Sequence, residues 1–342
     1  MNQPKWAFLK DYVKGFNKNT SITEIARAAI SDYELDTYTV EQVRKIISRE
    51  VNREEVKPLS GIVKSNSYNT ALNTNLPKTT LSSYNKPNLI KPKSFTTTGT
   101  YLVLGCVHVP GHNKSLINGI TNYLIDHKVQ GLMLIGDFLD LNSLSGHDIG
   151  QFTALPDLTL GKEYEEGNKI LDQLTNSLKP SADKVYIYGN HEGRYNRYMA
   201  DMQKSKATIE SPEKALKLEE KGFHVYNNWQ QDYITLGNHL DLLHGQFFNV
   251  HSAKKHIDVY RGSVMYAHTH RIQMYVEGST GGFNIGWGGD VNSPLFNYMP
   301  RGTKSQWQNG FALVTIDDKG DYYVQQVFHH NNKFNINGKF YN

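Results

Sequence analysis

Short apolar runs alternate with amphipathic stretches through the middle of the chain. Three runs, at 101–104, 132–135 and 185–188, each end in a polar turn that contains glycine. Between them, apolar side chains recur at helical spacing over 116–125 and 170–178. The order strand, helix, strand, helix, strand predicts parallel strands buried on both faces. Five later runs predict a second sheet packed on the first: 233–236, 239–243, 264–266, 311–316 and 322–328.

The first 53 residues have a helical pattern instead. Apolar residues recur at helical spacing over 6–16. Capping-box pairs then precede two further helices, Ser21 with Glu24 and Thr39 with Gln42. Three short helices of this kind can form a helix-turn-helix module. The third carries basic residues on its polar side, as a helix that enters a DNA groove does: Arg44, Lys45, Arg49 and Arg53.

The balance of charged residues does not decide what this module, residues 1–53, binds. The first 60 residues hold ten Lys/Arg and nine Asp/Glu, so a bundle that docks a protein or mediates oligomerisation fits as well as DNA binding. The net charge of +4 reflects the stretch 61–100, which contains five lysines and no acid. Because that stretch is rich in Asn, Ser, Thr and Pro, it cannot bury enough apolar surface to become ordered. We interpret 54–98 as a flexible basic linker, with either a mild affinity for anions or no partner.

Composition narrows the class of protein. The 342 residues suggest about two domains, and 21 Tyr, 14 Phe and 4 Trp supply material for a core. The single cysteine excludes a disulfide scaffold and a cysteine-rich zinc module. No apolar run approaches the roughly 18 residues that span a bilayer, and the N-terminus lacks a signal-peptide pattern. The expectation is a soluble, cytoplasmic protein without a membrane partner.

The candidate chemistry lies in the turns after the predicted strands, and all 14 histidines fall within 101–342. Five motifs stand out: Cys106-Val107-His108, Gly136-Asp137-Phe138-Leu139-Asp140, Gly189-Asn190-His191-Glu192, His244-Gly245 and Ala267-His268-Thr269-His270. Ligands gather at the carboxyl ends of parallel strands, so these turns are expected to converge. Residues i and i+2 of an extended segment point the same way, so 106 with 108, and 268 with 270, can approach one centre. Converging N, O and S donors suit transition metals.

This order and spacing resembles the calcineurin-like metallophosphoesterase family, whose pattern is D-x-H, G-D-x-x-D, G-N-H-[DE], a lone His and G-H-x-H. The resemblance covers about 100–290, and five ordered motifs make it specific. It implies an α/β sandwich of two mixed sheets flanked by helices, and some phage phosphoesterases carry a helix-turn-helix-like module before it. The expectation is a chain in three parts: a helical module (1–53), a linker (54–98) and a metallophosphoesterase domain (99–342).

The resemblance implies a site for two divalent metal ions, which would be manganese, zinc or iron. The ligands of the first ion would be Cys106, His108, Asp137 and His270. Those of the second would be Asp137, Asn190, His244 and His268, with Asp137 bridging. In the family the two ions hold a phosphoryl oxygen and lower the pKa of a water, whose hydroxide attacks phosphorus. His191 corresponds to the family's catalytic histidine, which acts on the leaving oxygen or the phosphoryl charge and does not bind metal.

Four further residues are candidates for supporting roles. Asp140 either orients a ligand or the catalytic histidine, or is a solvated turn carboxylate. Arg194 and Arg197 follow the third motif and either bind substrate phosphate or begin a helix with salt bridges. His112 either contacts the substrate or is a surface turn residue. The glycine-rich stretch 278–289 lacks the Lys-Ser/Thr of a phosphate loop and is interpreted as a flexible wall beside the site.

Two positions depart from the family pattern. Ala267 stands where the family has glycine. Alanine fits at this position if the backbone φ there is negative. Cys106 stands where the family has aspartate. A thiolate can replace the carboxylate as an anionic ligand, its longer bond to zinc (about 2.3 Å) offsetting the shorter side chain. Alternatively, the first metal site is weakened or the whole site is inactive. Because every other ligand position is filled, we favour the ligating thiolate.

Three hypotheses follow. In the first, the protein is a metal-dependent phosphoesterase for phosphate mono- or diesters, with nucleic acid as a candidate substrate because of the preceding module and linker. In the second, the module docks a protein and the enzyme is a protein phosphatase. In the third, the chain is a DNA-binding regulator whose phosphoesterase site is degraded. The sequence leaves the substrate, the metal and the oligomeric state open.

Overall fold

The computed structural model describes residues 22–32, 41, 43–47, 92–145, 157–202 and 209–342. The chain divides into two units, Met1–Asn85 and Lys86–Asn342. In the first, α2 spans Ile22–Asp32, where the capping pattern predicts a helix, and residues 43–47 are also helical. The helix predicted over 6–16 lies outside the described residues, as do residues 54–91 of the predicted linker.

Two of the basic side chains on the third predicted helix are paired within that helix. Arg44 donates to Glu41 at 2.7 Å, and the Lys45 amine lies 3.6 Å from the same exposed carboxylate. Arg49 and Arg53 lie outside the described residues. The helix-turn-helix arrangement and DNA binding by residues 1–53 therefore stay predictions.

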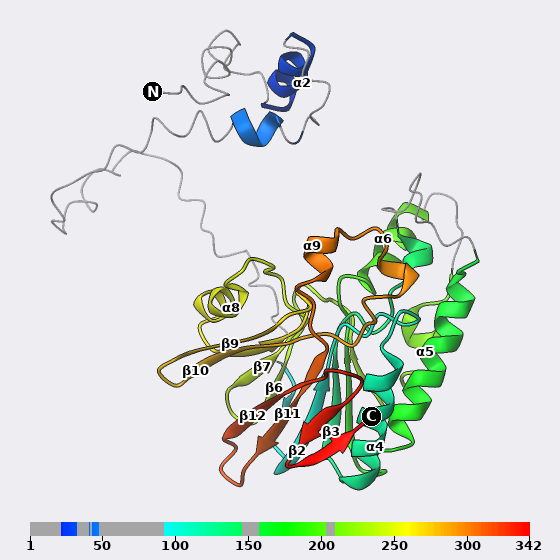
Figure 1. Cartoon of the computed structure of the whole chain (residues 1–342), viewed down its shortest axis with the longest axis vertical. Coiled ribbons are helices and arrows are strands. Elements are labelled where there is room, and N and C mark those ends of the chain that lie inside the picture. The colour runs from blue at the N-terminus through cyan, green and yellow to red at the C-terminus, as the bar shows by residue number, and fades with distance from the viewer. Residues whose placement is uncertain (1–21, 33–40, 42, 48–91, 146–156, 203–208) are drawn as a thin grey trace, which may run out of the picture. The chain divides into compact units, whose positions relative to one another are not determined.

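The second unit is an α/β sandwich of two six-stranded sheets flanked by helices, which confirms the predicted fold class (Figure 1). The first sheet has the order β12-β11-β2-β3-β4-β5. Four of its strands are parallel: β2 (Gly99–Leu104), β3 (Gly131–Ile135), β4 (Asp183–Ile187) and β5 (His224–Tyr226). The other two extend it antiparallel beside β2: β11 (Gly310–Ile316) and β12 (Tyr322–Phe328).

The second sheet has the order β1-β6-β7-β8-β10-β9. Its strands are β1 (Ser94–Phe95), β6 (Ile234–Leu236), β7 (Leu240–Leu242), β8 (Ser263–Tyr266), β9 (Ile272–Glu277) and β10 (Thr280–Ile285). The prediction that 311–316 and 322–328 belong to this second sheet is wrong. These residues lie in β11 and β12 of the first sheet, where β11 pairs with β2. Within the predicted linker, β1 pairs with β6, so its last part belongs to the sandwich.

The stretch 278–289 is not the flexible wall expected from its glycines. Its residues 280–285 form β10, which pairs with β8 on one side and β9 on the other. A Cβ on Gly282 would lie 2.5 Å from the carbonyl oxygen of Ala253 in α8 (Ser252–Tyr260). Glycine is therefore needed there because α8 packs closely against this sheet.

Two apolar cores hold the sandwich together. On β2, Leu102 and Leu104 belong to the core beneath α4 (Lys114–Asp126) and α5 (Leu160–Thr175), whereas Tyr101 and Val103 belong to the core between the sheets. Both faces of the strand are thus buried, which explains its continuous apolar run.

The remaining elements are η2 (Asn142–Leu144), α6 (Gly193–Met202), α7 (Pro212–Ala215), η3 (Pro294–Phe296), α9 (Arg301–Lys304), β13 (Phe334–Ile336) and β14 (Lys339–Tyr341). Among the described residues, no helix has the length and apolarity needed to cross a membrane.

Candidate metal centre

The turns after β2, β3, β4, β7 and β8 bring the motif side chains together. Within these turns the backbone is not extended, so the reason given for 106 with 108 and 268 with 270 is wrong, although Cys106 and His108 do approach one centre. Five motif residues have a positive φ: Cys106 (51°), His108 (52°), Asp137 (52°), His268 (63°) and His270 (59°). Left-handed backbone in non-glycine residues costs about 1–3 kcal/mol each and clusters at functional sites. The turns are therefore shaped for side-chain placement at a cost in stability.

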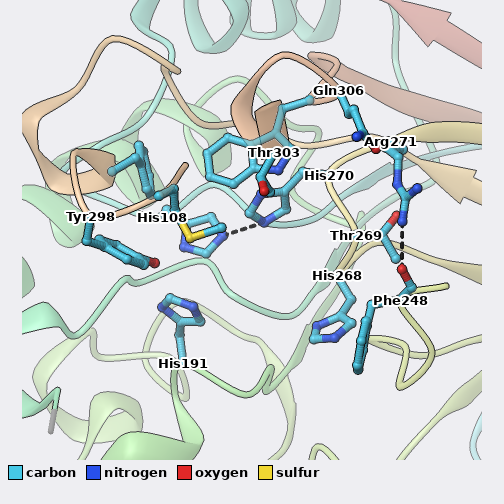
Figure 2. Close-up of a pocket in the computed structure, with 13 residues that line it drawn as sticks. His108, His191, Phe248, His268, Thr269, His270, Arg271, Tyr298, Thr303 and Gln306 are labelled. Atoms are coloured by element: carbon cyan, nitrogen blue, oxygen red, sulfur yellow. Dashed lines mark hydrogen bonds between the residues drawn. The ribbon is translucent and has the colours of Figure 1, made fainter. Parts of the chain in front are cut away.

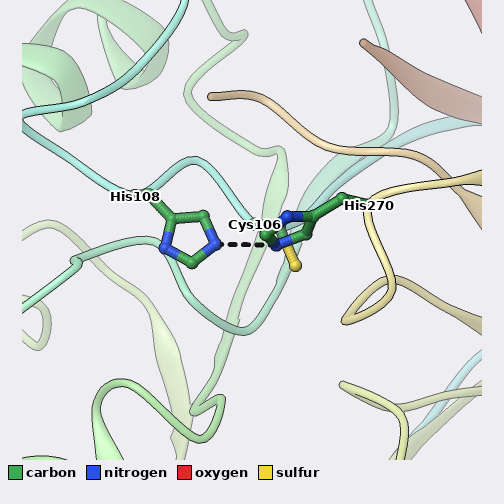
Figure 3. Close-up of side chains that lie close together, drawn as sticks. All are labelled: Cys106, His108 and His270. Carbon is green, nitrogen blue, oxygen red and sulfur yellow. Dashed lines mark hydrogen bonds between the residues drawn. The ribbon is translucent and has the colours of Figure 1, made fainter. Parts of the chain in front are cut away.

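Cys106, His108 and His270 form the first cluster (Figure 3). The two histidine Nε2 atoms lie 3.0 Å apart, and the Cys106 Sγ lies within 4.8 Å of a nitrogen of each ring. The His108 Nδ1 faces a carboxylate oxygen of Asp140 at 3.0 Å, so Nδ1 carries the hydrogen and Nε2 presents its lone pair. Two ring nitrogens bound tetrahedrally to zinc would lie about 3.3 Å apart. The observed spacing fits a shared metal ion.

Asp137, Asn190, His244 and His268 form the second cluster. The His244 Nε2 lies 3.2 Å from Asp137 Oδ2 and 2.9 Å from Asn190 Oδ1. The Asn190 oxygen also lies 2.9 Å from His268 Nδ1. His244 Nδ1 faces the Ile135 carbonyl oxygen at 3.1 Å, which fixes a hydrogen on Nδ1. The acceptor atoms that converge here therefore need a proton or a metal cation between them.

Asp137 stands between the two clusters. Its Oδ2 lies 3.2 Å from His244 Nε2 and 3.9 Å from His108 Nε2. Burial disfavours its charge, but the His244 and His191 rings hold the pKa of Asp137 well below its usual value. One ionised carboxylate thus faces the ligands of both clusters, as a bridging group does.

Three candidate ligand rings are neutral, whereas the pKa of the thiol and that of His244 are raised, the latter by the Asp137 carboxylate against the effect of burial. Burial, together with the neighbouring His244, lowers the pKa of His268 to about 3. Burial also lowers the pKa of His108 and of His270, so these rings are neutral, as ligands must be. Burial and the Asp137 charge raise the pKa of the Cys106 thiol well above its usual value, although its Sγ accepts the His268 N–H at 3.1 Å. A thiolate here therefore requires a cation, and this donor set suits zinc or iron.

Asp140 fixes the orientation of the rings around it. Its carboxylate lies 3.0 Å from His108 Nδ1 and accepts from Arg194 Nη1 at 3.1 Å. Its backbone oxygen accepts from His191 Nδ1 at 2.9 Å. Asp140 is buried, so the solvated-carboxylate alternative is wrong. Arg194 is buried against it, which corrects the prediction that Arg194 binds substrate and supports the alternative of a salt bridge at the start of a helix.

His191 is anchored through one nitrogen, and its other nitrogen lies near Asp137, with which His108 and His191 form a further group of ligand-type side chains. Because Nδ1 donates to the Asp140 carbonyl oxygen, Nε2 is directed toward Asp137 Oδ2, 4.0 Å away, and the ring lines a cavity. Burial opposes protonation of this ring, but the Asp137 and Asp140 carboxylates raise the pKa of His191. The ring is therefore suited to donate a proton into the cavity.

Glu192, which was not among the predicted site residues, holds the turns themselves. Its buried carboxylate accepts the backbone N–H groups of Asp137 (2.9 Å) and Leu139 (3.0 Å), as well as that of Gly189 and the hydroxyl of Tyr186. It thereby ties the second motif to the third. The acidic residue that closes Gly-Asn-His-Glu is the sequence signal for this role.

A cavity of about 300 Å³ opens over the two clusters (Figure 2). Histidine rings from both clusters and His191 line it together with Phe248, Phe296, Tyr298 and Trp307. In Figure 2, Tyr298 and Phe248 stand at opposite edges with the imidazoles between them.

His112 and Arg197, both predicted to bind substrate, lie outside this cavity. His112 is buried, so the surface alternative is wrong, and it lines a separate cavity with Lys114 and Glu166 near α4 and α5. That position also removes the reason for a substrate contact. Arg197 is exposed on α6 and lines a third cavity.

Comparisons with known proteins add limited information. No family model matches the chain, and no curated protein matches it. Solved structures that are similar include vacuolar protein sorting 29 from Cryptosporidium parvum, at 16% identity over 72% of this chain and 99% of that one, with a TM-score of 0.38. Vps29 from Entamoeba histolytica complexed with Zn²⁺ has 14% identity over 70% and 95%, with a TM-score of 0.35. A predicted phosphoesterase from Streptococcus pneumoniae has 16% identity over 70% and 89%, with a TM-score of 0.28. Function must therefore be argued from the site itself.

Proposed function

We propose that this chain is a metal-dependent phosphoesterase with residues 99–342 as its catalytic domain. The observation that supports it is the convergence of six ligand-type side chains around the single carboxylate of Asp137. The first ion would be held by Cys106, His108, Asp137 and His270. The second would be held by Asp137, Asn190, His244 and His268. When bound, two divalent cations polarise phosphoryl oxygens and lower the pKa of water.

His191 is the candidate catalytic residue. Its ring lines the cavity while Nδ1 is fixed on Asp140, so a protonated ring can donate to the leaving oxygen as the ester bond breaks. Asp140 is a positioning residue, because it orients both His108 and His191 and is itself held by Arg194.

The test measures metal content and hydrolysis on the same preparation. Mass spectrometry is expected to find up to two zinc, iron or manganese ions per chain. Hydrolysis of 4-nitrophenyl phosphate or its bis ester is expected to stop with chelator and return when metal is restored. A chain that binds no metal and cleaves neither ester would contradict the proposal and favour a degraded site.

Cys106 is tested by two substitutions. Cys106→Asp supplies a harder anionic donor, so we expect activity to be kept or raised and the preference to move toward manganese. Cys106→Ser lacks an anionic donor, so one of the two ions is expected to be lost. If Cys106→Ser binds the same metal as the wild type, the thiolate is not a ligand.

A further inference from the structure

A cavity of about 460 Å³ beside the second cluster is lined by groups that the proposed chemistry does not use. We call it the Trp229 cavity. Its walls include Asn196 and Arg197 of α6 and the loop residues Asn228, Trp229 and Gln230. Its volume lies in the range of small-molecule sites, about 300–1,000 Å³.

Arg197 and Trp229 offer donors that the described part of the chain does not satisfy. The exposed guanidinium of Arg197 forms no ion pair among the described residues and donates only to the Asn190 carbonyl oxygen, at 3.4 Å. Trp229 is partly exposed, and its indole N–H has no hydrogen-bond partner among the same residues. A guanidinium without an ion pair, beside a partly exposed aromatic ring, suits an anionic, ring-bearing ligand.

This cavity lies against the second cluster. Arg197 contacts the backbone of Asn190, and the Trp229 ring meets the His244 ring edge-on, with centroids 6.3 Å apart. The cavity of about 300 Å³ over the two clusters, in contrast, includes His108 and His270 of the first cluster, together with His268 of the second. Between them, the two cavities therefore adjoin ligands of both clusters, and the Asp137 carboxylate faces both clusters.

A phosphate monoester has one substituent on phosphorus, so it would leave one of the cavities without a role. A diester has two. In the Trp229 cavity, Arg197 can bind a second phosphate, the indole can stack on a base, and amide side chains can pair with base edges. The other cavity offers Phe248, Phe296, Tyr298 and Trp307 for stacking. Unpaired bases can stack in this way, whereas the bases of a duplex cannot.

We infer that the Trp229 cavity is a subsite for the nucleotide flanking the cleaved bond, and that the substrate is a single-stranded nucleic acid. This inference rests on the phosphoesterase function proposed above. In the reaction, the oxygen of one water forms a bond to phosphorus and the ester bond to one arm breaks. The leaving oxygen takes a proton, and the other proton of the water goes to solvent. The products are one strand that ends in a phosphate monoester and one that ends in a hydroxyl.

Binding to the full chain is measured first, with chelator present so that no cleavage interferes. Fluorescence anisotropy of a labelled single-stranded oligodeoxynucleotide is followed over a salt series. Arg197→Ala is expected to weaken binding about 10- to 100-fold at low salt. It is also expected to make the plot of log binding constant against log salt concentration less steep. The expected change in slope is about 0.7, the value for one phosphate contact on a single strand. Arg261→Ala is the matched control, because Arg261 is an exposed arginine before the amino end of β8, opposite the end that leads to His268.

Kinetics then separate the two arms of the substrate. Trp229→Ala is expected to lower kcat/KM for the oligonucleotide and for bis(4-nitrophenyl) phosphate by about tenfold more than for 4-nitrophenyl phosphate. Trp229→Phe, which keeps a stacking ring, should recover most of the loss. Arg197→Ala should reduce oligonucleotide cleavage more than bis-ester cleavage, because only the oligonucleotide carries a second phosphate.

Two results would overturn the inference. One is oligonucleotide binding that neither Arg197→Ala nor Trp229→Ala alters. The other is a phosphoserine peptide that is hydrolysed with this dependence on Arg197 while the oligonucleotide is neither bound nor cleaved. If no ester is hydrolysed, the proposed function fails, and the anisotropy series still decides whether the subsite binds a strand.

Discussion

Glu192→Gln tests whether one buried carboxylate holds the metal-binding turns in place. The wild-type Oε2 accepts the N–H groups of Asp137 and Gly189, while Oε1 accepts the N–H of Leu139 and the hydroxyl of Tyr186. Glutamine has the same shape but only one acceptor oxygen. It is expected to keep that oxygen on the side of Asp137, because the Tyr186 hydroxyl on the other side can turn and accept instead of donating.

The expected loss in the free energy of unfolding follows from the hydrogen-bonding groups that Glu192→Gln leaves without a partner. The Leu139 N–H would face an amide NH₂, so one charge-assisted hydrogen bond of about 1.5–3 kcal/mol is lost and a buried donor costs about 1–3 kcal/mol more. Part of this is offset, because burial and the nearby Asp137 charge already disfavour the ionised form and raise the pKa of Glu192. We expect a net loss of about 2–4 kcal/mol, which is about 5–15 °C in Tm for a domain of this size.

The assay combines thermal unfolding with metal titration. Because Glu192 holds the backbone of Asp137, metal affinity is expected to fall about 10- to 100-fold along with the Tm. Glu163→Gln is the matched control: Glu163 is also buried and accepts the backbone N–H of Asn142 at 2.7 Å, but it touches no proposed ligand. A Glu192→Gln protein with wild-type Tm and metal affinity would refute the reasoning.

Three further outcomes are expected. His191→Ala should keep its metal by mass spectrometry while kcat falls about 10²- to 10⁴-fold, because the ring acts on the leaving group and not on the metal; metal loss at equal folding would contradict this. Asp137→Asn should lose both ions, since it removes the charge that faces both clusters, and retention of two ions would show the ligand assignment to be wrong. Burial raises the pKa of Glu163 to about 7, so its contribution to stability is present below pH ~4.5 and is lost as pH rises through ~7. Relative to Glu163→Gln, the wild type should thus lose about 3 kcal/mol between pH 4.5 and 8, and parallel Tm profiles of the two proteins would contradict this.

The strands were predictable where the apolar run itself determines the structure. The runs 101–104 and 132–135 lie in β2 and β3, because strands covered on both faces must be apolar throughout. Sheet membership was not predictable in this way. β11 pairs with β2, some two hundred residues earlier in the chain, and no local pattern encodes that partner. Gly282 of β10 was misleading because it serves the close approach of α8 and not flexibility.

The candidate site was predictable in its residue types but not in its geometry. Motif order alone brings His108 and His270 together as candidates, and the structure places their ring nitrogens 3.0 Å apart. The positive φ of both residues and the role of Glu192 depend on hydrogen bonds between separate turns, which spacing along the chain does not reveal. His112 failed as a candidate for the same reason, because its distance from His108 in sequence says nothing of the direction in which the turn sends its side chain.

The two departures from the family pattern meet in one contact. The Cys106 Sγ accepts the N–H of His268, the residue that follows Ala267. Ala267 is not among the residues with positive φ, which is the condition under which alanine can replace glycine. A Cβ on Gly105 would lie only 2.7 Å from the Ala267 Cβ, so the missing side chain at 105 leaves room for the methyl at 267. The turn that carries the thiol therefore packs directly on the turn that carries His268 and His270. We therefore expect a change of size or charge at 106 or 267 to affect both clusters of candidate ligands.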